Sequence, residues 1–271
     1  MNAVDRALVL GPGGPAGTAW MAGLLLGLRR HGVDLGTADL TVGTSAGAIT
    51  AAALLAGGPA HFEGLGTPAL PPTRPPAAPS PEVLGQVFAV LGDPTLDPVE
   101  KRRRVGRLAL DRATPEALAA LLAGRTALIG ATAWPDRPLL ITAVEAHRGE
   151  AVVWDRESGV PLAHAVAASS AFPGVDPPVP ALGGKYLDGA LRAGTNVDLA
   201  AGARLVVLLD PMARSTAAED GDTGRIVTLT PDGASADAIG PNPADRTVWP
   251  AAHAAGLRQG AATAPRLTGL W

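Results

Sequence analysis

The first sixty residues contain a repeated pattern that restricts the fold strongly. Two short apolar runs, residues 6–11 and 39–43, each end at a glycine turn, and helical segments follow them at 17–32 and 46–58. Short apolar runs bounded by glycine are typical of buried strands. A repeated order of strand, turn and helix makes consecutive strands parallel and packs the helices on the sheet. The sequence therefore predicts an α/β fold with a mainly parallel central sheet.

A proline-rich stretch interrupts this pattern. Residues 59–81 contain eight prolines, which exclude a core helix or a central strand and favour a mobile loop or the edge of a lid. Further helices are predicted at 82–91, 97–110, 114–123, 161–172 and 243–264. Further strands are predicted at 138–146, 151–155, 185–189, 203–211 and 225–231, the first two of these as a hairpin. We interpret residues 1–271 as a single domain with an insertion, proline-rich and helical, at about 57–137.

Composition excludes several classes of site. The chain has no cysteine, which excludes disulfides and thiolate metal sites, and its five histidines are scattered. The net charge of −3 gives no general attraction to nucleic acid. The N-terminus lacks the pattern of a signal peptide, and the apolar runs are too short and interrupted to span a bilayer. These features predict a cytoplasmic protein without a transmembrane segment.

Ser45 stands in the second glycine turn, within the sequence GTSAG at 43–47. A G-x-S-x-G turn that follows a strand and opens a helix is a nucleophile elbow, which exposes the serine hydroxyl. Gly43 and Gly47 fill the positions where strand and helix pass too closely for a side chain. The positive end of the following helix favours negative charge beside the serine. Alone, the motif also fits a tight packing corner.

The first glycine turn, GPGGPAG at 11–17, offers hydrogen-bond donors for an oxyanion. Gly13 and Gly14 can present backbone N–H groups with no side chain in the way. A nucleotide-binding loop is the alternative, because a glycine-rich turn after the first strand binds pyrophosphate in dinucleotide folds. Pro12 and Pro15 weaken this alternative, since each removes an N–H donor. No acidic residue ends a clear second strand, which weakens it further.

Two residues are candidates for the base that takes the proton of Ser45. His253 would serve in an α/β-hydrolase, but it lies in an apparent helix instead of a loop. Asp188 ends a short strand and is followed by Gly189, so the chain can turn there and leave the carboxylate accessible. A free aspartate is ionised at neutral pH but is a weak base, and it needs a short contact and a partly dry site.

Four segments together resemble the patatin-like phospholipases. GPGGPAG resembles the glycine-rich oxyanion loop of that family, and GTSAG its nucleophile elbow. ASSAFPGVDPPV at 168–179 resembles the Ala-Ser-Ser-Ala-x-Pro-Gly segment, and DGA at 188–190 resembles the motif that carries the base. The resemblance implies a three-layer α/β/α sandwich and a serine acyl hydrolase with Ser45 as nucleophile and Asp188 as base. It also implies an oxyanion hole at Gly13 and Gly14, a covalent acyl-enzyme, a lipid or other acyl ester substrate, and no cofactor or metal.

The chain departs from the family pattern at three positions. Pro12 replaces a glycine of the oxyanion loop, and Ala16 stands where the family usually has arginine or lysine. Asp176 stands where an apolar residue is more usual. A member that binds lipid without catalysis is therefore an alternative function, beside the α/β-hydrolase that would use His253.

The segment KRRRVGR at 101–107 carries five basic residues in seven. A solvated helix face is the simpler interpretation of such a run. The alternative is a peripheral contact with an anionic membrane surface, to which each basic residue contributes about 1 kcal/mol.

Overall fold

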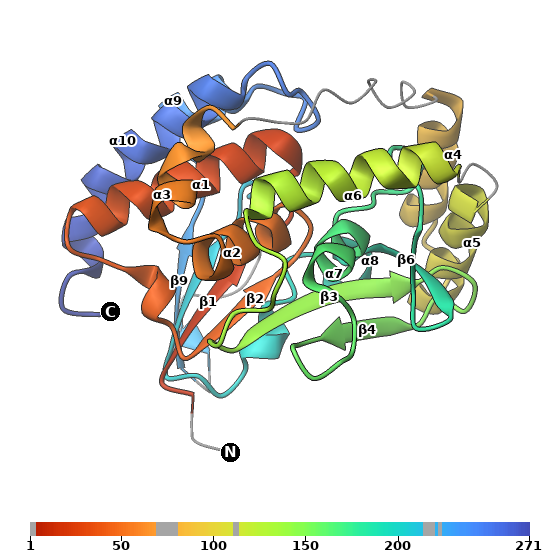
Figure 1. Cartoon of the computed structure of the whole chain (residues 1–271), viewed down its shortest axis with the longest axis horizontal. Helices are drawn as coiled ribbons and strands as arrows, with labels where there is room; N and C mark the ends of the chain where they lie inside the picture. Colours follow the sequence, from red (N-terminus) through yellow and green to blue (C-terminus); the bar gives the residue numbers. More distant parts are fainter. Residues whose placement is uncertain (1–3, 69–80, 111–113, 214–219, 222–223) are drawn as a thin grey trace.

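A computed structural model describes residues 4–68, 81–110, 114–213, 220–221 and 224–271 (Figure 1). A central sheet, mostly parallel, is flanked by helices, which confirms the α/β fold expected from the sequence. The strands are β1 (Arg6–Leu10), β2 (Leu40–Gly43), β3 (Leu139–Glu145), β4 (Ala151–Trp154), β5 (Val179–Ala181), β6 (Gly184–Asp188), β7 (Leu205–Leu209), β8 (Asp220–Gly221) and β9 (Gly224–Leu229).

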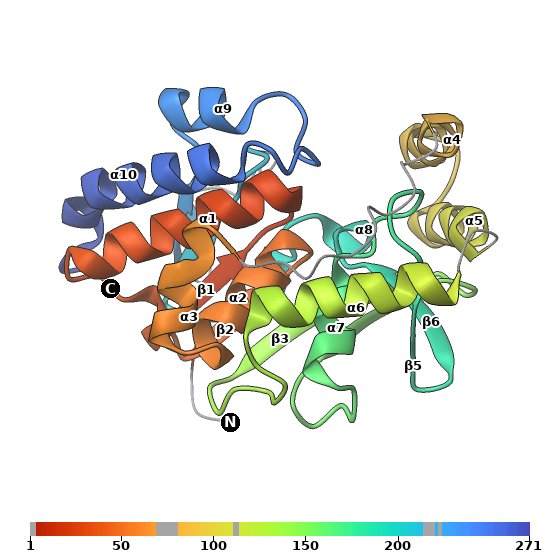
Figure 2. The same cartoon turned by 45° about the horizontal axis from the view of Figure 1, so that its top comes forward.

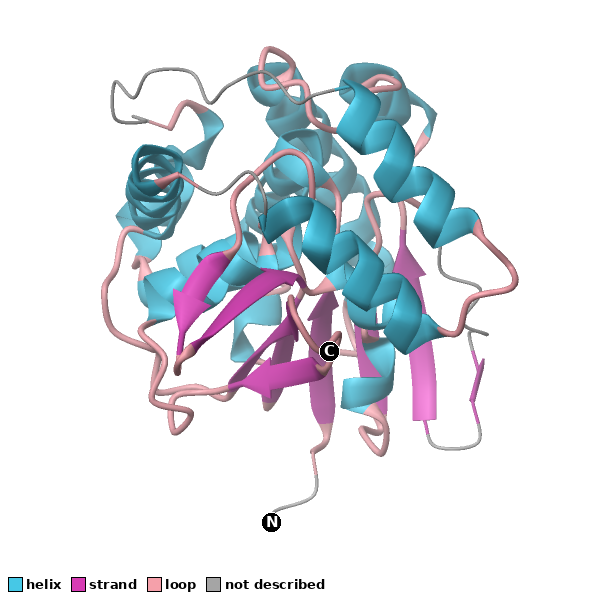
Figure 3. Cartoon of the chain, turned by 90° about the vertical axis from the view of Figure 1, so that its right-hand side faces the viewer, coloured by secondary structure: helices cyan, strands magenta, loops and turns pink. Residues whose placement is uncertain are grey.

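The helices lie mainly on one side of the strands (Figure 3). The α-helices are α1 (Gly14–Arg30), α2 (Ala46–Ala56), α3 (Pro59–Glu63), α4 (Pro81–Gly92), α5 (Pro98–Leu110), α6 (Pro115–Ile129), α7 (Leu162–Ser169), α8 (Ala190–Ala193), α9 (Gly233–Ile239) and α10 (Trp249–Leu267). The 3-10 helices are η1 (Leu35–Thr37), η2 (Gly64–Gly66) and η3 (Val197–Ala200). No helix within the described residues has the length and apolarity that crossing a bilayer requires.

The strand order is β5-β6-β3-β2-β1-β7-β9-β8, and β4 also pairs with β3. The parallel pairs are β1 with β2, β1 with β7, β2 with β3, and β7 with β9. The predicted hairpin is present, because β3 and β4 pair antiparallel. Since β1, β2 and β7 are parallel, the loops that follow them emerge at one edge of the sheet, where ligands of α/β proteins bind.

Alternating residues of the strands build a core on each face of the sheet. The larger core joins Leu8 and Leu10 of β1 to the helices α1, α2, α7 and α10. The smaller core begins with Ala7 and Val9 and is closed by η3. The helical layers are thus unequal in thickness, with most helices on one face and η3, α8 and the end of α5 on the other.

Helices α1 and α10 pack closely because glycines line their interface. A Cβ atom on Gly23 or Gly27 of α1 would overlap backbone oxygens of α10. A Cβ on Gly256 or Gly260 of α10 would likewise overlap backbone oxygens of α1. The Trp20 Nε1–H donates a buried hydrogen bond to Gln259 Oε1 across this contact, at 2.9 Å. Helix α1, which begins at the first glycine turn, is therefore fixed by α10.

The proline-rich stretch contains more structure at its start than the sequence predicts. Pro59 begins helix α3, because proline fits the first turn of a helix, where its missing N–H is not needed. Phe62 and Leu65 are buried in the main core, so this part is not a loop edge. Residues 69–80, on which most of the loop or lid expectation falls, lie outside the described residues.

The helices of the insertion form two groups. Helix α6 packs against α2 and α7, whereas α4 and α5 lie at the end of the molecule away from α10 (Figures 1 and 2). Helix α6 runs past its predicted end at Ala123 because Gly130, with a φ of +71°, supplies the left-handed residue that closes it. Strand β5 and helix α9 are also absent from the sequence prediction.

Substitution of Gly256 by alanine tests the contact between α1 and α10. Because the new methyl group would meet the backbone of α1, we expect a loss of stability of about 1–3 kcal/mol. Urea unfolding followed by circular dichroism measures this loss.

Gly124→Ala in α6 is the matched control. A Cβ at Gly124 has nothing within 4 Å, so this helix substitution is expected to stabilise by up to about 1 kcal/mol. Equal unfolding midpoints for the two variants would contradict the close packing.

Candidate active site

Strand β3 brings Ser45 and Asp188 together. Strand β2 pairs parallel with the first part of β3, as far as Gly43 opposite Ile141. Strand β6 pairs antiparallel with the last part of β3, and it ends with Asp188 opposite Ala143. Strand β4 pairs with both Ile141 and Ala143 and therefore fills the other edge of β3. The ends of β2 and β6 consequently meet on one edge, on either side of Thr142.

Ser45 adopts the geometry of a nucleophile elbow. Its φ of 56° and ψ of −115° lie outside the regions that non-glycine residues prefer, and α2 begins at the next residue. A Cβ on Gly47 would overlap the carbonyl oxygen of Leu10, and one on Gly43 would lie 2.7 Å from Ala48 Cα. The two glycines therefore leave the space that the turn requires, as the sequence predicts.

Ser45 and Asp188 are joined by a short hydrogen bond. The Ser45 hydroxyl donates to Asp188 Oδ2 at 2.7 Å, and the Ala190 N–H donates to the other carboxylate oxygen at 2.9 Å. Ser45 is 8% exposed and Asp188 is 2% exposed. Burial, which disfavours the ionised carboxylate, raises the pKa of Asp188 to about 7. At neutral pH the carboxylate is thus poised between its protonated and ionised forms.

The glycine loop lies directly beside this pair. The Thr44 N–H donates to Leu10 O at 3.0 Å, and the Gly47 N–H donates to Gly11 O at 3.1 Å. Gly13 is the N-cap of α1, and Gly14 is its first residue. No hydrogen bond within the described residues uses the N–H of Gly13 or Gly14. The start of α1 therefore offers unpaired donors and the positive end of a helix near the elbow.

His253 lies away from this arrangement. It is part of α10, and the edge of its ring packs against Gly66 of η2. Its Nε2 is buried without a hydrogen-bond partner in the described residues, and burial lowers the pKa of the ring. None of the hydrogen bonds among the described residues joins His253 to Ser45 or Asp188.

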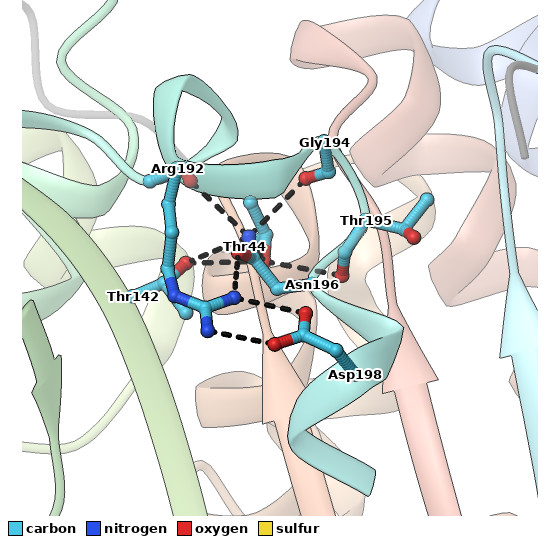
Figure 4. A network of polar contacts seen from close by, with 8 residues as sticks. Thr44, Thr142, Arg192, Gly194, Thr195, Asn196 and Asp198 are labelled. Atoms are coloured by element: carbon cyan, nitrogen blue, oxygen red, sulfur yellow. Dashed lines mark hydrogen bonds and ion pairs between the residues drawn. The ribbon is translucent and has the colours of Figure 1, made fainter. Parts of the chain in front are cut away.

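A buried asparagine that the sequence does not single out ties the two turns together (Figure 4). Asn196 Nδ2 lies within hydrogen-bond distance of Thr44 Oγ1 at 2.9 Å, Gly189 O at 3.1 Å and Thr142 Oγ1 at 3.3 Å. Asn196 is fully buried, with a φ of +57°. Its side chain links the residue before Ser45 to the residue after Asp188, on either side of Thr142.

Two charged residues hold Asn196 from the outside (Figure 4). Arg192 Nη1 donates to Asn196 Oδ1 at 2.8 Å, and Arg192 also pairs with Asp198 at 2.7 Å. The bond to Arg192 fixes which end of the amide faces the two threonines. The sequence signal for this role is weak, since an asparagine close to a glycine, as in Gly194-Thr195-Asn196, also fits an ordinary turn.

The basic segment of α5 is partly neutralised. Glu100 lies 2.8 Å from Arg104, 3.6 Å from Arg107 and 4.0 Å from Arg103. The Nε groups of Arg102 and Arg103 donate to carbonyl oxygens of the turn between β3 and β4. These contacts favour the solvated helix face among the two interpretations of this segment.

The described residues contain no group of three histidine, aspartate or glutamate side chains that could hold a metal ion. The candidate site consists of Ser45, Asp188 and the glycine loop.

Comparison with known proteins identifies the family. Residues 8–201 match the family model of the patatin-like phospholipases. The chain belongs to this family. The match includes Gly13, Gly14, Ser45 and Asp188, and it confirms the resemblance inferred from the four sequence segments. Membership in the patatin-like phospholipases supports a lipid acyl hydrolase in general terms.

A solved structure similar to this patatin-like chain is the crystal structure of VipD from Legionella pneumophila. The two are 12% identical, with a TM-score of 0.47, and the alignment covers 96% of this chain and 67% of that one. The search of curated proteins finds no match.

Substitution of Asn196 tests whether its hydrogen bonds hold the two turns. Asn196→Gly keeps the left-handed backbone accessible but leaves buried polar groups unpaired, so we expect a loss of stability of roughly 2–4 kcal/mol. Asn196→Ala is expected to lose about 1 kcal/mol more, because alanine is strained at this φ. Urea unfolding measures both losses.

Asp198→Asn is the control for this series. Asp198 is the outermost member of the network, and its side chain is 53% exposed, so its loss is expected to cost less than about 1 kcal/mol. An Asn196→Gly variant as stable as Asp198→Asn would show that the network contributes little.

Proposed function

We propose that this protein is a serine acyl hydrolase that cleaves lipid acyl esters with a dyad of Ser45 and Asp188. The observation that carries the proposal is the 2.7 Å hydrogen bond from the Ser45 hydroxyl to Asp188, in a buried site at a strained turn. An aspartate whose pKa lies near 7 is a much better base than a free one. This pairing of nucleophile and base is what covalent acyl transfer requires.

In the first half of the reaction Ser45 Oγ attacks the ester carbonyl carbon, and its proton moves to Asp188 Oδ2. The carbonyl oxygen becomes an oxyanion, to which the N–H groups of Gly13 and Gly14 would donate. These N–H groups have no partner within the described residues, and they lie at the positive end of α1. When the intermediate collapses, the ester bond breaks and Asp188 returns the proton to the leaving alcohol.

In the second half water replaces the alcohol. Asp188 takes a proton from water as the water oxygen attacks the acyl-enzyme carbonyl, and the same N–H groups bind the new oxyanion. Collapse of this intermediate breaks the bond to Ser45 Oγ, and Asp188 returns the proton to the serine. The products are a fatty acid and the free enzyme, and no step requires a metal or an organic cofactor.

The proposed substrates are lipids with an acyl ester bond, as the family implies. A peripheral contact with a lipid surface is part of the proposal. It is supported by Phe88 of α4, an apolar ring that is 58% exposed. The neighbouring helix α5 contributes less, because Glu100 pairs with Arg103, Arg104 and Arg107.

Labelling with a fluorophosphonate tests the nucleophile without a choice of substrate. An activated serine displaces fluoride and forms a stable phosphonyl ester, so we expect a label on Ser45 that mass spectrometry can locate. Ser45→Ala should abolish the label. Asp188→Asn should slow labelling by about a hundredfold or more, because the base is lost.

Folding of Asp188→Asn is the control. Asparagine can accept from Ala190 N–H and donate to Ser45 Oγ, so the contacts of Asp188 can be retained. Because the pKa of Asp188 is higher in the folded than in the unfolded protein, its ionisation lowers the free energy of unfolding. This loss of stability is absent below the usual pKa of 3.8 and complete above about pH 7. The variant should therefore unfold at the wild-type temperature or higher at pH 8.

A folded wild type that takes no label and cleaves no ester, yet binds fatty acid, would favour the alternative of a lipid-binding member. Full labelling of a folded Asp188→Asn variant would exclude the dyad.

The pH dependence of labelling tests the state of Asp188. Only the ionised carboxylate can accept the serine proton, so the rate should rise with pH and level off above about pH 7. Well below that value it should fall about tenfold for each pH unit. Rates measured between pH 5 and 9 on wild-type protein supply the curve, and a flat profile down to pH 5 would contradict an aspartate buried as a base.

A further inference from the structure

The segment Ser169–Ala171, at the C-terminal end of α7, contacts both residues of the proposed dyad. The Ser45 N–H donates to Ser169 Oγ at 3.0 Å. The Gly189 N–H donates to Ser169 O, and the Asp188 N–H donates to Ala171 O, each at 3.1 Å. A displacement of Ser169–Ala171 would therefore disturb the hydrogen bonds that hold both Ser45 and Asp188.

Ser170, in the middle of this segment, is gripped by an arginine from the insertion. Arg125 of α6 donates through Nε to Ser170 Oγ at 2.7 Å, and its Nη2 lies 3.4 Å from Ser170 O. The Ser170 hydroxyl donates in turn to Val166 O at 2.8 Å, so its oxygen is free to accept from Arg125. Arg125 is 8% exposed. These contacts connect α6 to the segment that holds the dyad.

Asp176 completes the arrangement. Its Oδ2 lies 3.3 Å from Arg125 Nη2, and the two side chains are 10% and 11% exposed. A buried ion pair of this kind loses so much hydration that a well-packed apolar pair is often as stable. Stability alone therefore gives little reason for the ion pair between Arg125 and Asp176. Asp176 is also a position at which the sequence departs from the family pattern.

Both charges act on the base. Arg125 favours the ionised form of Asp188 and lowers its pKa, whereas Asp176 disfavours that form and raises the pKa. Both effects are smaller than that of burial. Arg246, exposed in the segment before α10, is the third charge near the pair, and it lowers the pKa of Asp176. The pair thus hydrogen-bonds to Ser170 and also changes the electrostatic potential at Asp188.

We propose that Arg125, held by Asp176, is a positioning residue for the dyad, which fixes the segment Ser169–Ala171 from helix α6 and brings a pair of opposite charges to the segment that holds Asp188. Neither Arg125 nor Asp176 touches the reacting atoms in this assignment. The inference rests on the proposed function, because it concerns how Ser45 and Asp188 are held for that reaction.

The test is the rate of fluorophosphonate labelling at Ser45 against pH, in wild type and in Arg125→Met, Arg125→Lys and Asp176→Asn. Arg125→Met should raise the apparent pKa of labelling by about half a pH unit or more, and Asp176→Asn should lower it by a similar amount. Arg125→Lys keeps the charge but loses the fork geometry. It should keep the wild-type apparent pKa and reduce the maximum rate roughly tenfold.

Opposite shifts distinguish this role from a structural one. Both single substitutions break the same ion pair, so a purely structural role would lower the melting temperature and the rate in both while leaving the apparent pKa unchanged. An unchanged apparent pKa in both variants, or shifts in the same direction, would overturn the electrostatic part of the proposal. Arg258→Met is the matched control, because it removes an ion pair with Asp232, at 2.6 Å, on the α9 side of the molecule. It should retain the wild-type profile.

The double variant Arg125→Met/Asp176→Asn covers the case in which a single variant does not fold, because it leaves no unpaired charge. Its apparent pKa should return close to that of wild type, and its maximum rate should still fall roughly tenfold, since Ser170 has lost its partner. A wild-type maximum rate in this folded variant would overturn the positioning role. If the wild-type protein itself takes no label at Ser45, the proposed function fails instead of the role of Arg125.

Discussion

The site depends on how strand β3 shares one of its edges between two strands of opposite direction. Strand β2 runs along the first part of that edge and stops at Gly43, and β6 arrives from the other end and stops at Asp188. Because β2 runs parallel to β3 and β6 runs antiparallel to it, the carboxyl ends of β2 and β6 point toward each other along this edge. Because the strands converge on Thr142, a hydroxyl and a carboxylate that are 143 residues apart in sequence reach hydrogen-bond distance.

The properties of the carboxylate come from its surroundings more than from its residue type. Burial raises the pKa of Asp188, while the hydrogen bonds from Ala190 and Ser45 lower it. The charges of Asp176 and Arg125 add opposing contributions. Burial with few hydrogen-bond donors therefore brings the pKa of Asp188 close to neutral pH. The same burial lowers the free energy of unfolding when the carboxylate is ionised.

Features that depend on neighbouring residues could be predicted from the sequence, and those that depend on distant contacts could not. The elbow at Ser45 follows from local sterics, since Gly43 and Gly47 lie two residues away from it. Asp188 is a candidate base because of the turn that follows it and the family resemblance. Asn196 and Arg125 carry little local signal, because their partners come from β2, β3 and the loop after α7. The sequence does not predict strand β5, since three residues with a central proline do not form a recognisable strand pattern.

The interlocked glycines of α1 and α10 have a consequence for how the protein is made. Trp20 and Gln259, which meet across this interface, are 239 residues apart in sequence, and Gly14 also packs against Pro243. During synthesis the first helix leaves the ribosome long before the helix that fixes it. Contacts of such separation form late in folding, since a long loop must close first. The start of α1 gains its final support only after residues 243–267 have been added, so a partly synthesised chain already contains Ser45 before the neighbouring glycine loop is fixed.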